Sequence, residues 1–183
     1  MRAFKGFWHD LTCLGYQFRE DRVNRTSEAN CCQNGFHCAE NPLDCLSYYW
    51  DWKNSVYYEV DASGDLDEDG RDSKISCTEL RLVRRLTLEQ LLLEGAAYMV
   101  AHPIRRWNSR VHKETGLAYD GFAVVRGKDP KASGKVGDIL VILKEEAESP
   151  EIEEVALFRI DRKTYQPDRY YGVCGTCLEG RQR

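Results

Sequence analysis

The sequence predicts an α+β fold with a mainly antiparallel sheet and two principal helices, at about 42–51 and 87–101. Extended segments outnumber helical ones and often follow each other directly, which is typical of antiparallel sheets rather than of strands that alternate with helices. Hydrophobic residues make up 42% of the 183 residues and charged residues 31%, as in an ordinary globular chain. We expect a single domain over 1–183, and a subdivision near 103–116 is the alternative.

Two strands are expected before residue 30. In residues 2–8, small or polar side chains alternate with Phe and Trp, which is typical of a strand. Residues 14–18 have a similar composition, and the polar residues 19–30 predict a loop.

The first helix is predicted from its capping signals. A short apolar run, 36–39, is expected to be a strand. Asn41 then suits the N-cap, and Pro42 occupies the first helical position, where its missing N–H costs nothing. Strand composition returns at 55–60.

A longer strand and the second helix are predicted next. In 74–83 the apolar positions change face near Glu79, which indicates a β-bulge. Thr87 and Gln90 form a capping box before apolar residues at helical spacing, and Pro103 follows the end of that helix.

The remaining chain is expected to be mostly extended. Residues 103–116 are basic and irregular, and 128–134 predicts a turn-rich loop. Further strands are expected at 117–125, 138–144 and 154–161, followed by a last hairpin within a flexible tail at 170–183.

Composition and charge exclude some classes of protein. No apolar run approaches the roughly 20 residues of a membrane span, and the N-terminus lacks the apolar core of an export signal. We therefore expect a cytoplasmic protein without membrane contact, whose eight cysteines are reduced thiols. The net charge of −4 does not indicate a particular class of partner. The charge is uneven, because Lys and Arg outnumber Asp and Glu from 84 to 135.

The cysteines offer a zinc site as an alternative. Zinc prefers four Cys or His ligands in a tetrahedron. The candidate ligands are Cys31, His37, Cys38, Cys174 and Cys177, of which the last two form a C-x-x-C pair. The default interpretation is small buried thiols, with no metal and no cofactor. The acidic stretch 64–72 is expected to be a solvated turn, because its residues 65–70 match only the first half of a calcium loop.

A surface that binds a partner protein is the favoured functional interpretation. Arg and aromatic side chains are common anchors at protein interfaces. The candidate residues are Arg105, Arg106, Trp107 and Arg110 in the basic segment, with Tyr48 and Trp52 at the first helix. Basic and aromatic side chains together also suit nucleic acid, but the acidic total favours a protein partner.

Four motifs occur in order in the first half of the chain. They are Arg2-Ala-Phe-Lys-Gly-Phe, Leu11-Thr-Cys-Leu-Gly-Tyr-Gln-Phe18, Gly35-Phe-His-Cys-Ala-Glu-Asn-Pro-Leu-Asp-Cys-Leu-Ser-Tyr-Tyr49 and Asp72-Ser-Lys-Ile75. Together they resemble a family of phage and prophage proteins that has no established activity, and the resemblance is best over 1–85. It implies a bacterial host cytoplasm, where small phage proteins bind and block host or defence proteins.

A looser similarity concerns the expected strand, helix and strand of 35–60, which resemble a part of ADP-ribosyltransferase-like folds that lines a nicotinamide pocket. That family's pattern wants Arg or His, then Ser, Thr or Tyr, then Glu, and Arg2, Tyr49 and Glu79 match it. The favoured hypothesis is a non-enzymatic binder or inhibitor of a host or defence protein. An NAD-using enzyme, a zinc-stabilised module and a nucleic-acid-binding module are the alternatives.

Overall fold

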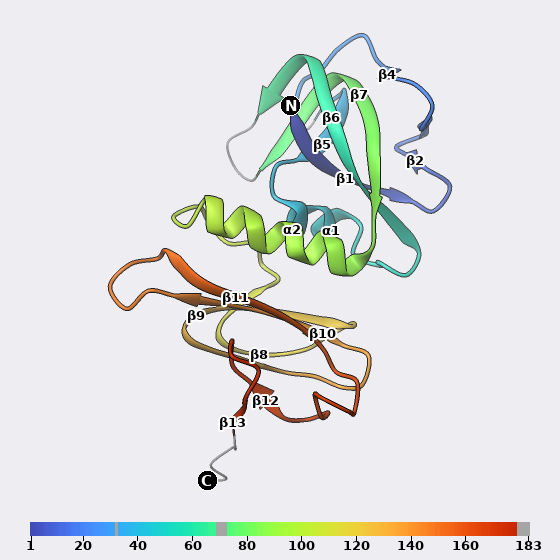
Figure 1. Ribbon diagram of the computed structural model, residues 1–183. Helices are drawn as coiled ribbons and strands as arrows, with labels where there is room; N and C mark the ends of the chain where they lie inside the picture. The colour runs from blue at the N-terminus through green and yellow to red at the C-terminus, as the bar shows by residue number, and fades with distance from the viewer. Residues whose placement is uncertain (32, 69–72, 179–183) are drawn as a thin grey trace. The chain divides into compact units, whose positions relative to one another are not determined.

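A computed structural model describes residues 1–31, 33–68 and 73–178, and it confirms an α+β fold with mainly antiparallel sheets (Figure 1). The chain divides into two compact units, Met1–Tyr98 and Met99–Arg183. The division falls inside the second helix, before the basic segment 103–116. None of the described helices has the length and apolar character needed to cross a bilayer.

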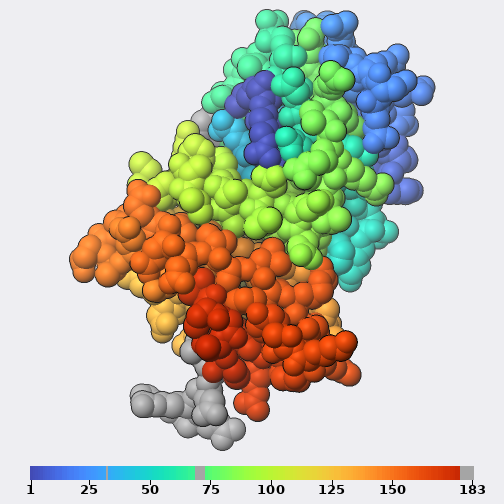
Figure 2. All heavy atoms as spheres, viewed as in Figure 1, coloured from blue at the N-terminus to red at the C-terminus, as the bar shows by residue number. Residues whose placement is uncertain are grey.

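The sheet of the first unit closes on itself. Its strands are β1 (Arg2–Trp8), β4 (Asn24–Arg25), β5 (Phe36–Ala39), β6 (Ser55–Glu68) and β7 (Lys74–Leu86). β1 pairs with β6, β6 with β7 and β7 with β5, all antiparallel. β5 then returns to β1 through the pair Phe4 and Ala39, which completes the circuit. In Figure 2 the dark blue atoms of the first strand lie beside the blue-green atoms of β6.

A bulge lies where the apolar pattern of β7 changes face, but its extra residue belongs to β6. Gly64 and Asp65 stand opposite the single residue Thr78, next to Glu79. Gly64 has a φ of +76°, which glycine adopts without strain, and the Asp65 N–H donates to the Thr78 hydroxyl at 2.9 Å. β6 therefore continues into the stretch expected to be an acidic turn, of which residues 69–72 lie outside the described residues.

A tight hairpin brings two side chains to the core of the first unit. β2 (Thr12–Cys13) and β3 (Tyr16–Gln17) are joined by Leu14 and Gly15, both with positive φ, as a type I′ turn requires. The Tyr16 ring then packs edge-on against two core rings, Phe18 and Phe36, with centroids 4.7 Å apart in each case. Cys13 packs against the same core.

The first helical segment is shorter than the expected 42–51. It consists of a 3₁₀ turn, Pro42–Asp44, and α1 (Cys45–Tyr48). The Asn41 side chain caps it, accepting from the Leu43 N–H at 3.1 Å. The chain leaves the helix at Tyr49, whose φ of −120° and ψ of 64° are not helical.

The second helix, α2 (Leu88–Ala101), begins as predicted. The Thr87 N–H donates to the Gln90 side chain at 2.9 Å, and the Gln90 N–H donates to the Thr87 hydroxyl at 3.2 Å. This reciprocal pair is the predicted capping box. Gly95 lets α2 approach the 3₁₀ turn, because a Cβ at residue 95 would lie 2.6 Å from the Leu43 side chain.

The second unit contains the parallel pairs of the structure. Its strands are β8 (Val111–Leu117), β9 (Phe122–Ser133), β10 (Ile139–Glu145), β11 (Ile152–Arg159), β12 (Tyr170–Tyr171) and β13 (Cys177–Leu178). β9 pairs in parallel with both β8 and β10, whereas β10 and β11 pair antiparallel, as do β12 and β13. Its core includes Val125, Leu140 and Ile142.

β9 runs through the segment expected to be a loop at 128–134. Here β9 bulges, because its residues 127–130 stand opposite the single β8 residue Glu114, which has a φ of +60°. The Glu114 carboxylate accepts from the N–H groups of Lys128 and Asp129, both at 3.0 Å. A side chain from β8 thus satisfies backbone donors that the bulge would leave without ladder partners.

Candidate functional site

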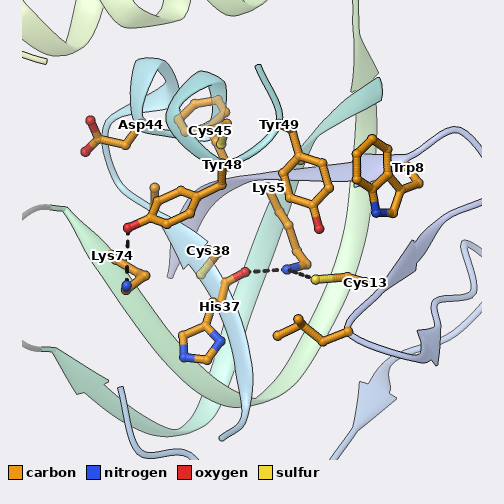
Figure 3. Close-up of a pocket in the computed structure, with 14 residues that line it drawn as sticks. Lys5, Trp8, Cys13, His37, Cys38, Asp44, Cys45, Tyr48, Tyr49 and Lys74 are labelled. Atoms are coloured by element: carbon orange, nitrogen blue, oxygen red, sulfur yellow. Dashed lines mark hydrogen bonds between the residues drawn. The ribbon is translucent and has the colours of Figure 1, made fainter. Parts of the chain in front are cut away.

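A pocket of about 440 Å³ opens in the first unit beside α1 (Figure 3). Its lining comes from β1, the β2–β3 hairpin, β5, α1 and the start of β7. The volume is within the range of sites that bind small molecules.

Lys5 lies in the wall of this pocket because β1 and β5 separate there. Phe4 and Ala39 form the register pair of these two strands, and His37 lies two residues before Ala39 on β5. Lys5 Nζ donates to that carbonyl at 2.6 Å and contacts Cys13 Sγ at 3.5 Å. Alternation along β1 puts Lys5 on the inward face with Phe7, and only 4% of its surface is exposed.

The surroundings of Lys5 compensate its charge only in part. The Phe7 and Phe18 ring centroids lie 5.2 and 5.3 Å from Nζ, which favours a cation weakly. Among the described residues no carboxylate pairs with this ammonium. A buried charge without a counter-ion is costly, so Lys5 is the residue that an incoming anion would stabilise most.

Aromatic rings form much of the remaining wall. Trp8 and Tyr49 pack edge to face with centroids 5.5 Å apart, and Figure 3 shows Tyr49 leaning over Lys5. Tyr49 lies close to β1 because residue 6 is glycine. A Cβ there would stand 2.6 Å from the Tyr49 ring.

A second cation lies across the pocket. Lys74 Nζ donates to the Tyr48 hydroxyl at 3.2 Å, at the opposite side from Trp8 (Figure 3). The carboxylate in the lining is Asp44, which accepts from the Ser73 hydroxyl at 2.6 Å and so is turned toward its own partner. Two lysines against one engaged carboxylate give the lining a positive balance.

Three other groups of the pocket have pKa values shifted toward their neutral forms. Burial, with the nearby charges of Lys5 and Lys74, lowers the pKa of His37. Burial raises the pKa of the Cys45 thiol to about 12. Burial and a hydrogen bond with Cys13 raise the pKa of Tyr49. The site can therefore hold an anion and stack a ring.

The residues of the NAD-using alternative lie in separate sets of contacts. Arg2 pairs with Glu59 at 3.0 Å and with Glu94 at 2.9 Å. Glu79 pairs with Arg25 at 2.9 Å. Of the three predicted residues, Tyr49 lines the pocket, and Arg2 and Glu79 are not in its lining.

The residues proposed for partner binding are divided between the units. Tyr48 and Trp52 lie in the first unit, Tyr48 with 53% of its surface exposed at the pocket and Trp52 half-buried. Arg105 and Arg106 are exposed in the second unit.

The other two residues of that group, Trp107 and Arg110, are half-buried and have contacts within the second unit. Arg126 Cζ lies 4.8 Å from the Trp107 ring centroid, and Arg110 Cζ lies 5.9 Å from that of Phe122. The Trp107 ring therefore has a packing partner within its own unit.

The candidate zinc ligands lie in separate parts of the described structure. His37 and Cys38 are neighbours on β5, and Cys31 Sγ contacts the Lys74 carbonyl at 3.7 Å. Cys174 and Cys177 lie in the second unit, on the β12–β13 segment. Within 1–31, 33–68 and 73–178, no group of three or more His, Cys, Asp or Glu side chains is placed to hold a metal ion.

Sequence reasoning missed Lys5 and Cys13. A signal existed for Lys5, because alternation in 2–8 puts it in line with Ala3 and Phe7 on the buried face. Its importance follows from the separation of β1 and β5, which no local pattern reveals.

Comparison with known proteins gives one match. A family model described as a domain of unknown function (DUF7666) matches residues 1–94, which cover almost all of the first unit and every residue that lines the pocket. No curated protein and no solved structure matches the chain.

Proposed function

The chain belongs to the family of this domain of unknown function, and on that premise we propose that its first unit is a non-enzymatic binding module for a small anionic molecule with an aromatic or otherwise flat apolar body. The observation that carries the proposal is Lys5, an ammonium that is 4% exposed and lies in the wall of a pocket of about 440 Å³; its hydrogen-bond partners within the described part of the chain are a carbonyl and a thiol.

Charge is the first argument for this ligand class. A carboxylate or phosphate at Lys5 would supply the missing counter-ion, and such charge-assisted hydrogen bonds are about twice as strong as neutral ones. Lys74 lies on the opposite side of the pocket and adds to the attraction.

The aromatic wall is the second argument. Phe4, Trp8, Tyr48 and Tyr49 offer faces and edges against which a flat apolar body packs. Burial raises the pKa of the Cys45 thiol to about 12, so this thiol stays protonated and unreactive at pH 7.

The test compares naphthoate with neutral naphthylmethanol by calorimetry on the full chain. We expect naphthoate to bind and naphthylmethanol to bind at least about tenfold more weakly, the usual effect of a charge-assisted hydrogen bond. Lys5→Met keeps the length of the side chain and removes its charge, so it should abolish the difference. The matched control is Lys53→Met, which lies outside the pocket lining and should change nothing.

Equal affinity for both probes in the natural protein, or an unchanged preference in Lys5→Met, would rule out this site. Because Lys5 also bridges two strands, the folded state of the variant is checked by circular dichroism. Lys5→Arg is the second variant, which keeps the charge and should keep the preference.

The phage or prophage setting, the bacterial cytoplasm and a host or defence protein as target stay predictions of the sequence resemblance. In the proposed scheme the small molecule is the primary ligand. The exposed side chains of Tyr48 and Trp50, at the end of α1, offer apolar surface that a host or defence protein could contact.

A further inference from the structure

The side chains of Lys5 and Cys13 are in contact in the pocket wall. Lys5 Nζ and Cys13 Sγ are 3.5 Å apart, and the Tyr49 hydroxyl forms a hydrogen bond with the same thiol. The contact joins β1 to the β2–β3 hairpin, so both partners are held by backbone structure rather than by chance side-chain positions.

We propose that this pair is an oxidation site at which peroxide links Lys5 Nζ to Cys13 Sγ through one bridging oxygen. The consequence for ligand binding rests on the proposed function, because the linkage would remove the ammonium that attracts the anion.

The chemistry balances with two molecules of hydrogen peroxide. The first oxidises the thiol to a sulfenic acid and leaves one water. Lys5 gives up one proton to become an amine, and the second peroxide oxidises the pair so that one N–H and the S–OH hydrogen are lost. An O–N bond forms and two further waters leave. The product holds one more oxygen and two fewer hydrogens than the thiol and amine together.

Placement favours Cys13 over the other thiols of the pocket. Cys13 is half-buried and lines the pocket, so peroxide can reach it. Cys38 and Cys45 are buried, and the pKa of each is raised, so little reactive thiolate forms. Proximity of the amine then makes capture of the oxidised sulfur faster than reaction with solvent.

The experiment treats the full-length protein with dilute hydrogen peroxide, blocks the remaining thiols and digests with trypsin. A linked Lys5 resists cleavage, so we expect a peptide of residues 3–19 that is intact after Lys5 and has one extra oxygen and two fewer hydrogens. Dithiothreitol should reverse the change. Lys5→Arg and Cys13→Ser should abolish this peptide, whereas the matched control Cys45→Ser should leave it unchanged.

Three results would overturn the proposal. The first is Cys13 oxidised to an acid in a peptide that trypsin still cuts after Lys5. The second is Cys13 in a disulfide. The third is a 3–19 peptide whose mass lacks the added oxygen.

Binding is measured separately, so that the two proposals can fail independently. We expect peroxide to reduce naphthoate affinity to that of Lys5→Met, and dithiothreitol to restore it. Linkage in a protein that never bound naphthoate would refute the proposed function and leave the oxidation site standing. Naphthoate binding in a protein that forms no linkage would refute the oxidation site and leave the proposed function standing.

Discussion

The ring of Tyr49 lies over Gly6 so closely that a Cβ at residue 6 would stand 2.6 Å from the ring. The ring also forms part of the pocket wall, and the chain leaves the helix at this residue. The close approach of Tyr49 to Gly6 therefore helps to shape the pocket wall.

Gly6→Ala should destabilise the first unit by about 1–3 kcal/mol, the usual cost of forcing extra volume into a packed interior. Urea denaturation followed by circular dichroism measures the change. In a Tyr49→Ala background the obstacle is gone, so the same substitution should cost markedly less. Additive effects of the two substitutions would show that the ring moves aside freely.

Arg126 joins three separate segments of the second unit. It is fully buried and donates to Glu145 at 2.7 Å, to the Pro103 carbonyl at 2.8 Å and to the Pro150 carbonyl at 2.7 Å. Its guanidinium also faces the Trp107 ring.

Arg126→Met should lower the stability of β9 and β10 by about 3–5 kcal/mol, because it leaves Glu145, whose side chain is only 12% exposed, without its partner. Amide hydrogen exchange of those strands is the measurement. The matched control is Arg105→Met, an exposed position where the same chemical change should have little effect. Equal effects at both positions would contradict the structural role of Arg126.

The Glu114 carboxylate makes the second unit sensitive to acid. Hydrogen bonds from the backbone N–H groups of Lys128 and Asp129 lower the pKa of Glu114. A group whose pKa is lower in the folded state contributes stability above its unfolded pKa, about 4.3 for Glu, and loses that contribution as pH falls through the folded value.

Glu114→Gln should therefore destabilise the protein at pH 7 by about 1 kcal/mol and should flatten the decline in stability below about pH 4.3. Urea denaturation at several pH values measures both effects. Glu148→Gln, at an exposed position, serves as control. A pH profile that Glu114→Gln leaves unchanged would exclude this contribution.

Two thiols should differ greatly in reactivity. Cys174 is exposed, and hydrogen bonds with the Thr176 side chain and backbone lower its pKa. Cys45 is buried, and its pKa is raised to about 12. Because the thiolate is the reactive form, iodoacetamide at pH 7 should modify Cys174 while Cys45 stays intact.

Mass spectrometry of a timed digest measures both modifications. Denaturation in urea should bring the two rates close together, since it removes burial and hydrogen bonds alike. Labelling of Cys45 as fast as Cys174 in the folded protein would contradict this assignment.

Local signals were sufficient for much of the fold. Alternation predicts β1, and the Thr87 and Gln90 capping box predicts the start of α2, because each depends on neighbours in sequence. The incorrect predictions concern segments whose structure depends on residues far away in the sequence. β9 continues past Lys128 because Glu114 on another strand satisfies its backbone.

The candidate site was less predictable for the same reason. Trp107 is a residue type common at interfaces, but the Arg126 guanidinium on β9 lies over its ring. The alternation of β1 predicts that Lys5 faces inward. Its hydrogen-bond partners, Cys13 and the His37 carbonyl, are brought to it only by folding, so no local pattern predicts that they are uncharged.

The closed circuit of strands in the first unit also constrains the order of assembly. β6 and β7 are adjacent in sequence and can pair early, whereas β1 must wait for strands that leave the ribosome some fifty residues later. Because β1 carries Lys5, a nascent chain that stops short of β6 has every pocket residue except Lys74 and still has no site. The pocket is therefore incomplete until β6 and β7, which close the sheet beside β1 and β5, have both been made.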